Sequence, residues 1–327
     1  MRAIIGIDVS KAKLDCLWLR DHETLKVKAK VIPNTAAGHE QLLKWVENNT
    51  GRSIKETLFV MEATGIYHEK LAYRLHKAEA QVAVINPAQA RDYAKSLGVR
   101  TKNDSKDRMV LARFGATQPI NLWQPEPEEV RELKALLSRL DAMQADIQRE
   151  MNRLEKAKIS QTSEDVETSI HNVLKHLTEE KQRLEKRIDD HMDGHPQLKE
   201  DKRLLETIPG VGGVISNYMV AAFHSRQFCK ASQMAAYFGL VPIEHESGSS
   251  VRHRPRLSKA GNAKVRAKLY MPAIVASRYN PDAHALYTRL LERGKSKMAA
   301  LGAVMRKLVH ICFGVLKHQQ VYCPQAI

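Results

Sequence analysis

Cysteine and long apolar runs are both scarce in this chain. The four cysteines are scattered, at positions 16, 229, 312 and 323, without CxxC or Cys/His ligand spacing. This pattern suggests neither a disulfide framework nor a structural zinc site. Because no apolar run reaches about 18 residues, we expect no membrane partner. The opening MRAIIGID is typical of a strand rather than a signal peptide, so we expect a cytoplasmic protein.

Aromatic residues are also few, and acidic residues are few in one part of the chain. Six Phe, nine Tyr and three Trp form no base-stacking motif, so direct base reading by the protein is unsupported. After position 201 the chain holds 19 Lys and Arg against 5 Asp and Glu, whereas residues 1–201 hold 33 against 32. Such a cationic surface attracts polyanions, above all nucleic acid. A solvated basic face or an acidic protein partner is the alternative.

Residues 1–125 show the pattern of an α/β domain. Strand-like segments at 4–8, 14–19 and 25–32 predict an antiparallel meander. Helices and strands then alternate, which predicts a parallel extension with helices on the sheet faces. Two predicted helices cover residues 35–47 and 67–77, and two more begin at Pro87 and at Asp104. The predicted strands between them cover residues 57–62 and 81–86. The order β-β-β-α-β-α-β-α matches the ribonuclease H-like fold.

Residues 126–196 predict two long amphipathic helices, separated by the polar stretch QTSEDVE. Apolar residues recur at steps of three and four, as in a coiled coil. They are Leu133, Leu137, Leu140, Ile147, Met151 and Leu154, and then Ile170, Leu174, Leu177, Leu184 and Ile188. A hairpin within one chain is possible, but the charged flanks favour pairing between subunits. We therefore expect a coiled-coil assembly segment and a homo-oligomer, either a dimer or a tetramer.

The sequence of residues 197–327 predicts a mostly α-helical domain. It begins with two helices that are joined by a tight turn of sequence IPGVGG. Gly210, Gly212 and Gly213 allow a sharp turn and leave backbone N–H groups uncovered at the start of the next helix. Such a turn suits a phosphate and resembles the helix-hairpin-helix motif that binds the DNA backbone. An ordinary turn between two helices is the alternative.

Four carboxylates follow elements that a sheet of this order brings together. Asp8 and Glu62 end two strands, in GIDVSK and MEATG, while Asp104 and Asp107 share one helix face in KNDSKDR. Converging carboxylates repel each other unless cations hold them, and Mg²⁺ prefers oxygen ligands. We expect one or two Mg²⁺ ions, replaceable by Mn²⁺; two ions about 4 Å apart would suit phosphoryl transfer.

Nine motifs occur in one order over nearly the whole chain: GIDVSK, MEATG, NPAQAR, KNDSKDR, IPGVGG, AAYFGLVP, ESGSSVR, LSKAGN and AKLYMPA. Together they resemble the bacterial insertion-sequence transposases of the DEDD type. The resemblance implies a Holliday-resolvase-like domain over 1–125 and a serine transposase domain over 197–327. It implies that Asp8, Glu62, Asp104 and Asp107 are the catalytic and metal-binding DEDD quartet, and that Ser247 is the nucleophile.

The resemblance also implies the partners. A structured non-coding RNA would pair with donor and target DNA, and the serine of one subunit would work with the carboxylates of another. A serine ester would conserve the phosphodiester energy during strand exchange. The cations around Ser247 would then grip phosphates or guide RNA. The predicted contacts are Arg252, Arg254, Arg256, Lys259, Asn262, Lys264, Arg266 and Tyr270.

Alternatives remain open. Without the resemblance, SGSS is a turn sequence, and Ser249 or Ser250 would serve as well as Ser247. His245 is near but is not assigned as the base. A metal-dependent junction-resolving nuclease that uses water would need the same four acids, and a non-catalytic nucleic-acid scaffold would bind without cutting.

Overall fold

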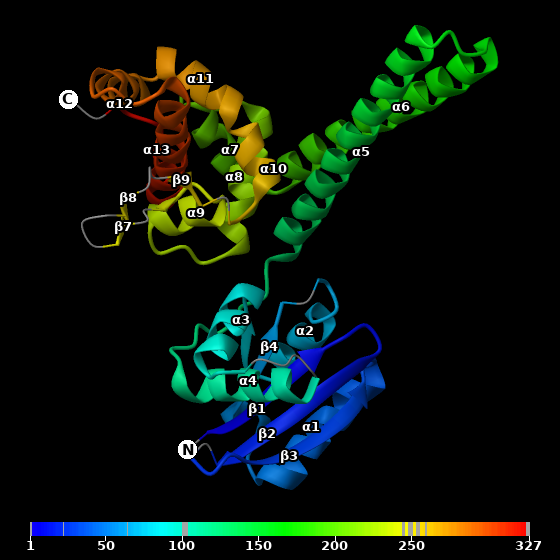
Figure 1. The fold of residues 1–327 in the computed structure, drawn as a ribbon, viewed down its shortest axis with the longest axis vertical. Coiled ribbons are helices and arrows are strands. Elements are labelled where there is room, and N and C mark those ends of the chain that lie inside the picture. Colours follow the sequence, from blue (N-terminus) through cyan, green and yellow to red (C-terminus); the bar gives the residue numbers. More distant parts are fainter. Residues whose placement is uncertain are drawn as a thin grey trace. The chain divides into compact units, whose positions relative to one another are not determined.

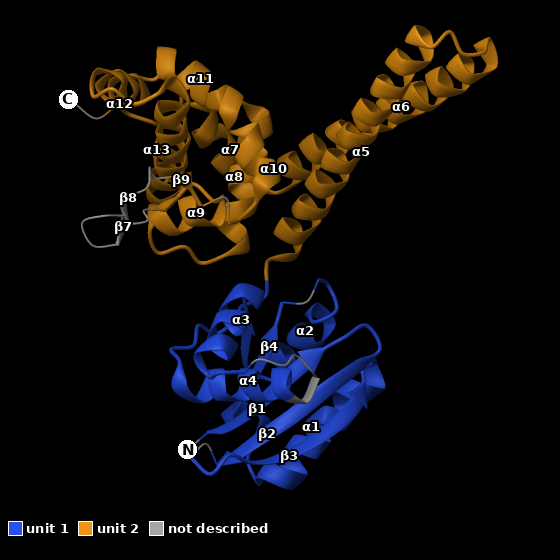
Figure 2. Ribbon diagram, in the orientation of Figure 1, with its two compact units in different colours: residues 1–125 blue, residues 126–327 orange. Residues whose placement is uncertain are grey.

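The computed structural model describes residues 2–21, 23–63, 65–99, 104–243, 246–247, 251–252, 256–258 and 260–324. The chain divides into two compact units, unit 1 at residues 1–125 and unit 2 at residues 126–327 (Figure 2). The finer division of unit 2 at residue 196, into an assembly segment and a serine transposase domain, stays a prediction.

Unit 1 is built on one mixed sheet in the strand order β3-β2-β1-β4-β5 (Figure 1). Its strands are β1 (Ala3–Val9), β2 (Lys13–Asp21), β3 (Lys26–Pro33), β4 (Thr57–Glu62) and β5 (Gln81–Ile85). Its helices are α1 (Ala36–Thr50), the 3₁₀ turn η1 (Ile54–Glu56), α2 (Glu69–Lys77), α3 (Pro87–Ser96) and α4 (Asp104–Thr117). The first three strands pair antiparallel, and β4 and β5 extend the sheet parallel to β1. The predicted meander and its parallel extension are both confirmed.

Strand alternation divides the core of unit 1 between the two faces of the sheet. Ile5 and Ile7 of β1 pack with residues of α1 and α2 on one face. On the other face, α4 packs on β1, β2 and β4, and α3 packs beside α4. Leu58 and Val60 of β4 contribute to that second face, where they cluster with Leu111. The sheet is therefore the middle layer between two layers of helices.

Two glycines bring the backbone of α4 directly onto the sheet. A Cβ added at Gly6 of β1 would lie 2.2 Å from the carbonyl oxygen of Arg108 and 2.6 Å from the backbone nitrogen of Ala112. A Cβ added at Gly115 of α4 would lie 2.6 Å from Val60 and 3.2 Å from Ile4. Side chains larger than glycine would force the helix away from the strands. The two contacts fix where α4 crosses the sheet and in which direction it runs.

Unit 2 begins with two long helices, α5 (Glu128–Ile159) and α6 (Glu164–Gly194), which pack against each other as a hairpin (Figure 1). The two predicted helices are confirmed, but the polar break is shorter than QTSEDVE. Glu164, Asp165 and Glu167 form the first turn of α6. Acidic residues stabilise a helix N-terminus, so these residues start the second helix instead of interrupting the pattern. The intramolecular hairpin is present; pairing between subunits stays a prediction.

The rest of unit 2 is mostly helical, as predicted. Its helices are α7 (Pro196–Glu206), α8 (Gly213–Ser225), α9 (Ala231–Tyr237), α10 (Ala263–Lys268), α11 (Tyr270–Tyr279), α12 (Pro281–Glu292) and α13 (Lys297–His318). Two short antiparallel pairs complete it: β6 (Pro242–Ile243) with β9 (Arg256–Leu257), and β7 (Glu246–Ser247) with β8 (Val251–Arg252).

Helix α13 is the central helix of unit 2. Within the part of the chain that the structure describes, it is the one helix long and apolar enough to span a membrane. However, 56% of its most apolar window is buried, and it packs against α9, α11 and α12. Burial inside a protein core accounts for this apolar length.

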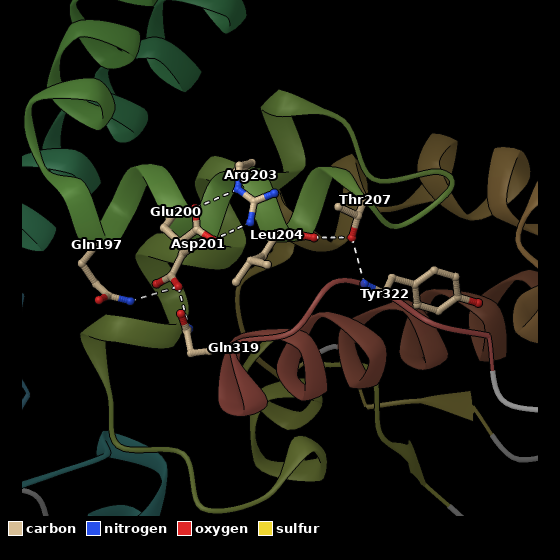
Figure 3. A network of polar contacts seen from close by, with 8 residues as sticks. All are labelled: Gln197, Glu200, Asp201, Arg203, Leu204, Thr207, Gln319 and Tyr322. Carbon is tan, nitrogen blue, oxygen red and sulfur yellow. Dashed lines mark hydrogen bonds and ion pairs between the residues drawn. The ribbon is translucent and has the colours of Figure 1, made fainter.

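The segment that follows α13 is held on α7 by polar contacts (Figure 3). The fully buried carboxylate of Asp201 accepts hydrogen bonds from the side-chain amides of Gln319, at 2.8 Å, and Gln197, at 3.2 Å. The backbone N–H of Tyr322 donates to the hydroxyl of Thr207 at 2.9 Å. A buried carboxylate is stable only when such donors surround it, so this network fixes the end of the helical core.

Candidate active site and nucleic-acid interface

Asp8 and Glu62 lie at the carboxyl ends of neighbouring parallel strands. The last paired residues of β1 and β4 are Ile7 and Met61, and the next residues along the two strands are Asp8 and Glu62. Side chains alternate along a strand, so both carboxylates lie on the α4 face, like Gly6 two residues earlier. Both side chains are half-buried. The structure thus places the two predicted strand carboxylates at one edge of the sheet.

The direction of α4 brings its first turn to the same edge. Gly115 lies beside Ile4, near the start of β1, while Arg108 and Ala112 lie over Gly6. Moving toward the N-terminus of α4 therefore means moving toward the end of β1 (Figure 1). The helix start at Asp104 comes to this edge; its side chain lies outside the described residues.

The rotation of α4 about its axis directs Asp107 toward β4. Leu111 packs in the cluster that contains Leu58 and Val60 of β4, whereas Ala112 packs with Leu17 and Leu19 of β2. Residues four apart share one side of a helix, so Asp107 lies on the β4 side, one turn beyond Leu111. Its side chain is half-buried. Asp107 is therefore placed on the side where Glu62 ends its strand.

This edge offers oxygen donors, which is the ligand type that Mg²⁺ prefers. Among the residues whose side chains the structure describes, no group of three or more Asp, Glu, His or Cys is close enough to hold a metal ion. The side chain of Asp104, the fourth member of the predicted quartet, lies outside the described residues. The donor chemistry of Asp8, Glu62 and Asp107 fits a hard divalent cation.

A fifth carboxylate, Asp15, was missed by the sequence reasoning. It pairs in register with Asp8 across β1 and β2, and its side chain is buried. Its oxygens face two cations: Lys13 Nζ at 2.9 Å and an Arg108 guanidinium nitrogen at 3.6 Å. In the sequence, Asp15 lies inside the apolar run LDCLWL, where a single acid looks like the exposed residue of a strand.

The predicted nucleophile and its arginines lie on short strands in unit 2. Ser247 ends β7, and its backbone pairs with Val251 in β8, whereas Arg252 pairs with Glu246. The side chains of these four residues lie outside the described residues, as do Arg254, Lys259, His245, Ser249 and Ser250. Arg256, in β9, pairs with Ile243 through its backbone and has an exposed side chain.

Three of the other predicted nucleic-acid contacts have structural partners. The Asn262 side chain caps α10 by accepting a hydrogen bond from the Val265 N–H at 3.2 Å. Arg266 donates to the Phe238 carbonyl at 3.1 Å, and the Tyr270 hydroxyl lies 3.7 Å from the Met298 sulfur. Lys264 is exposed on α10. Its availability makes it the clearest cation for a polyanion in this helix.

The IPGVGG turn joins α7 to α8, and its glycines differ in their surroundings. Gly210 has a φ of +97°, and an added Cβ would lie 2.8 Å from the Ala276 Cβ on α11. Its need for glycine therefore follows from conformation and packing. An added Cβ at Gly212 would meet nothing within 4 Å, whereas one at Gly213 would lie 3.3 Å from a carboxylate oxygen of Glu206. Phosphate binding by this turn stays a prediction.

A hollow of about 310 Å³ lies between α5, α8, α9 and α10 in unit 2. Its lining includes Lys134, Tyr237, Asn262 and Lys264. In its wall, the Tyr218 hydroxyl donates to Asp141 at 2.6 Å, and burial together with this bond raises the pKa of Tyr218. The sequence reasoning found Asn262 and Lys264 but missed the other lining residues, because they come from helices distant in the sequence.

Comparison with known families gives two matches along the chain. Residues 5–158 match a family described as Transposase, of the DEDD type of IS110 elements. Residues 202–288 match the family described as Transposase IS116/IS110/IS902 family. The first match covers the sheet of unit 1 and the hairpin helix α5, and the second covers α8 to α11.

Similar proteins extend over nearly the whole chain. The Pilin gene-inverting protein of Moraxella bovis is 31% identical over 324 residues, which is 98% of either chain. The Transposase for insertion sequence element IS1111A of Coxiella burnetii is 24% identical and covers 98% of this chain and 91% of its own. The structure of T. thermophilus RuvC in complex with a Holliday junction substrate matches 38% of this chain and 100% of that chain, at 13% identity and a TM-score of 0.25.

Proposed function

This chain is a DNA recombinase that belongs to the IS116/IS110/IS902 transposase family, and we propose that it cuts and rejoins DNA through a covalent bond to Ser247. In this proposal, Asp8, Glu62, Asp104 and Asp107 hold one or two Mg²⁺ ions beside the same phosphate. The sheet of unit 1 is then a ribonuclease H-like, resolvase-like scaffold.

The observation that carries the proposal is the crossing of α4 over β1. The contacts at Gly6 and Gly115 direct the start of α4 to the edge where Asp8 and Glu62 end their strands. Carboxylates at residues 8 and 62 thereby share an edge with the helix that begins at residue 104. A sheet that served only as a structural support would have no need for so many acids at one edge.

The proposed chemistry conserves the energy of the DNA backbone. Ser247 Oγ attacks the phosphorus and gives up its hydroxyl proton, the bond from phosphorus to the 3′ oxygen breaks, and the leaving 3′ oxygen takes up a proton to become a hydroxyl. A phosphoserine ester holds the other DNA end until a 3′ hydroxyl from a second strand reverses the step. Bound Mg²⁺ would polarise the phosphate and stabilise charge on the leaving oxygen. The four carboxylates would position it.

The cationic surplus after residue 201 suits nucleic acid in general, and the resemblance to this transposase family implies that a structured guide RNA binds besides DNA. We expect a homo-oligomer in the bacterial cytoplasm, at the nucleoid. Lys264, the hollow beside it and the arginines Arg252, Arg254 and Arg256, with Lys259, would bind phosphates of either polymer. Sequencing the RNA that copurifies with the protein tests this part: a single structured species is expected, and bulk cellular RNA would contradict it.

The central experiment separates the serine from the carboxylates. Wild-type protein, Ser247→Ala and Asp8→Ala would each be incubated with a DNA carrying the natural junction, and covalent adducts would be resolved on a denaturing gel. We expect the adduct in the wild type alone. Ser247→Ala should retain Mg²⁺ binding by calorimetry, whereas Asp8→Ala should lose it. Ser232→Ala, an exposed serine on α9, is the matched control and should behave like the wild type.

The other outcomes select the rival functions. An adduct that persists in Ser247→Ala removes this serine from the mechanism and points to Ser249 or Ser250. Cleavage without any adduct indicates a junction-resolving nuclease that uses water. Salt-sensitive binding without cleavage at any Mg²⁺ concentration indicates a non-catalytic scaffold.

A mixing experiment tests whether the site is shared between subunits. Ser247→Ala and Glu62→Gln are each expected to be inactive. If the serine of one subunit works with the carboxylates of another, mixed oligomers contain sites with one intact serine and one intact quartet, so recombination should reappear. If both parts of a site come from one chain, the mixture should stay inactive.

A further inference from the structure

Asp15 lies directly beside the carboxylate edge, but it belongs to no predicted catalytic set. It is paired in register with Asp8 on the neighbouring strand, and it shares the α4 face with Leu17 and Leu19. Two carboxylates opposite each other on adjacent strands repel one another. Lys13 and Arg108 offset this repulsion, Lys13 from the same strand and Arg108 from α4.

The contact between Asp15 and Arg108 is a polar link from this edge of β2 to α4. The Arg108 side chain is 16% exposed, and its distance to Asp15 is 3.6 Å. The Nε of Arg108 is buried without a hydrogen-bond partner among the described residues. A buried ion pair with an unused donor contributes little to stability, and an apolar pair of similar size would do as well. Its geometry is more specific than apolar packing, because only one rotation of the helix brings these two charges together.

That rotation matters for the neighbouring residue. Arg108 follows Asp107 directly, and successive helical residues point about 100° apart. With Arg108 held toward β2, Asp107 is directed toward β4, the strand that ends in Glu62. If α4 turned about its axis, Asp107 would leave the edge even though the helix stayed on the sheet.

We propose that Asp15 and Arg108 are positioning residues of the carboxylate site. Their ion pair sets the rotation of α4, so that Asp107 faces the edge formed by Asp8 and Glu62. The inference rests on the proposed function, because it concerns the site assigned there to Mg²⁺. In this role Asp15 holds the element that carries a metal ligand and does not contact the metal itself. In other metal sites, losing a residue that holds a ligand in place lowers metal affinity roughly 10–100-fold.

The deciding variant is Arg108→Gln, studied by Mg²⁺ calorimetry on the full chain without nucleic acid. Removing a positive charge beside a carboxylate cluster would, by Coulomb attraction alone, tighten Mg²⁺ binding. The positioning role predicts the opposite, a loss of about 10-fold or more. Arg108→Lys keeps the charge but not the planar guanidinium, so it should also weaken binding. It serves as the second variant if Arg108→Gln does not fold.

Asp15→Asn and the double variant complete the cycle. Both residues act through one ion pair. The double variant, Asp15→Asn with Arg108→Gln, should therefore bind Mg²⁺ no more weakly than whichever single variant binds it more weakly. Glu40→Gln is the matched control, because it removes an ion pair elsewhere in unit 1. There, two guanidinium nitrogens of Arg74 in α2 lie 2.5 and 2.8 Å from the two carboxylate oxygens of Glu40 in α1. This control should leave Mg²⁺ affinity unchanged.

A readout without metal tests the same idea. In metal-free protein, amide hydrogen exchange in the first turns of α4 should be at least about 10-fold faster in Arg108→Gln than in the wild type, and unchanged in Glu40→Gln. Equal exchange together with equal or tighter Mg²⁺ binding in both Arg108 variants would overturn the positioning role alone. A wild type that binds no Mg²⁺, or binds it as well with Asp8→Ala, would instead overturn the metal site of the proposed function and this inference with it.

Discussion

The two units hold their predicted catalytic residues in different ways. In unit 1, Asp8, Glu62 and Asp107 lie on elements of seven, six and fourteen residues that share one sheet and one core. In unit 2, Ser247 and Arg252 lie on paired strands of two residues each. The carboxylates are therefore fixed by the packing of a whole domain, and the serine segment by a local pairing.

This difference would correspond to the two kinds of chemistry that we propose for the two units. Metal ligands must be held to within tenths of an ångström, which extended elements with a shared core can provide. A nucleophile has to approach one phosphate, and a local hairpin is enough to present it. If this comparison is right, damage to unit 1 should affect metal binding and folding together, while damage to the serine segment should affect only covalent chemistry.

The largest expected effect is that of Glu62→Gln on strand cleavage. Loss of one carboxylate from the edge of unit 1 should reduce the cleavage rate on the order of 10³-fold, because charge on the leaving oxygen is no longer stabilised. The rate would be measured with labelled junction DNA in a single turnover. Glu47→Gln, on an exposed position of α1, should cleave like the wild type. A Glu62→Gln rate within tenfold of the wild type would remove Glu62 from the site.

The next effect is on stability, from Gly6→Ala. The added methyl group would have to displace the backbone of α4, which should lower the free energy of unfolding by about 3 kcal/mol. Chemical denaturation would measure it. Gly194→Ala in unit 2 is the control: an added Cβ there meets nothing within 4 Å, and a change below about 1 kcal/mol is expected. Similar losses of unfolding free energy in both variants would show that close contact between α4 and β1 at Gly6 is not what makes Gly6→Ala destabilising.

A smaller effect is expected at the end of unit 2, from Tyr322→Phe. The Tyr322 hydroxyl lies 2.6 Å from a carboxylate oxygen of Asp282, and the Asp282 side chain is buried. Loss of this hydrogen bond to a buried carboxylate should cost about 1–2 kcal/mol, read as a lower melting temperature. Tyr279→Phe, whose side chain is 70% exposed, should melt like the wild type. Equal melting of both variants would mean that the Tyr322 hydroxyl adds nothing to the stability of unit 2.

The smallest effect is a pH dependence that both units should share. Burial and nearby cations lower the pKa of His39, beside Arg74 in unit 1, and of His310, beside Arg306 and Lys307 in unit 2. Below the ordinary histidine pKa of about 6.5, the unfolded chain binds protons that the folded chain does not. The free energy of unfolding therefore decreases as the pH is lowered. Each residue should contribute about 1 kcal/mol or less, and solvent reduces the contribution of His310 further, because His310 is partly exposed whereas His39 is buried. His310→Gln should flatten the slope measured by denaturation between pH 7.5 and 5.5; an unchanged slope would contradict this assignment.

The fold of unit 1 could be predicted from the sequence because its patterns are local. Alternation identified the strands, and the change to helical periodicity identified the crossovers. The start of α6 was predicted wrongly, since the acids from Glu164 onward were interpreted as a break although they suit a helix N-terminus. The length of a polar stretch does not reveal where a helix begins inside it.

The carboxylate edge was predictable only in part. Strand ends and helix spacing predicted Asp8, Glu62 and the pair Asp104 and Asp107, but Asp15 depends on pairing between strands. Nothing in its own neighbourhood distinguishes it from a solvated acid. Ser247 is a different case, since its choice over Ser249 or Ser250 came from a family resemblance and not from chemistry.

The path of the chain through unit 1 has a consequence for the timing of its synthesis. Within unit 1, β1 is the first element to be synthesised and α4 the last, yet they pack against each other at Gly6. Nascent chains that end before α4 therefore hold Asp8 without the helix that packs over it, and under the proposed function they are expected to be unable to break DNA. Unfinished copies of the chain would then be harmless to the DNA of the cell.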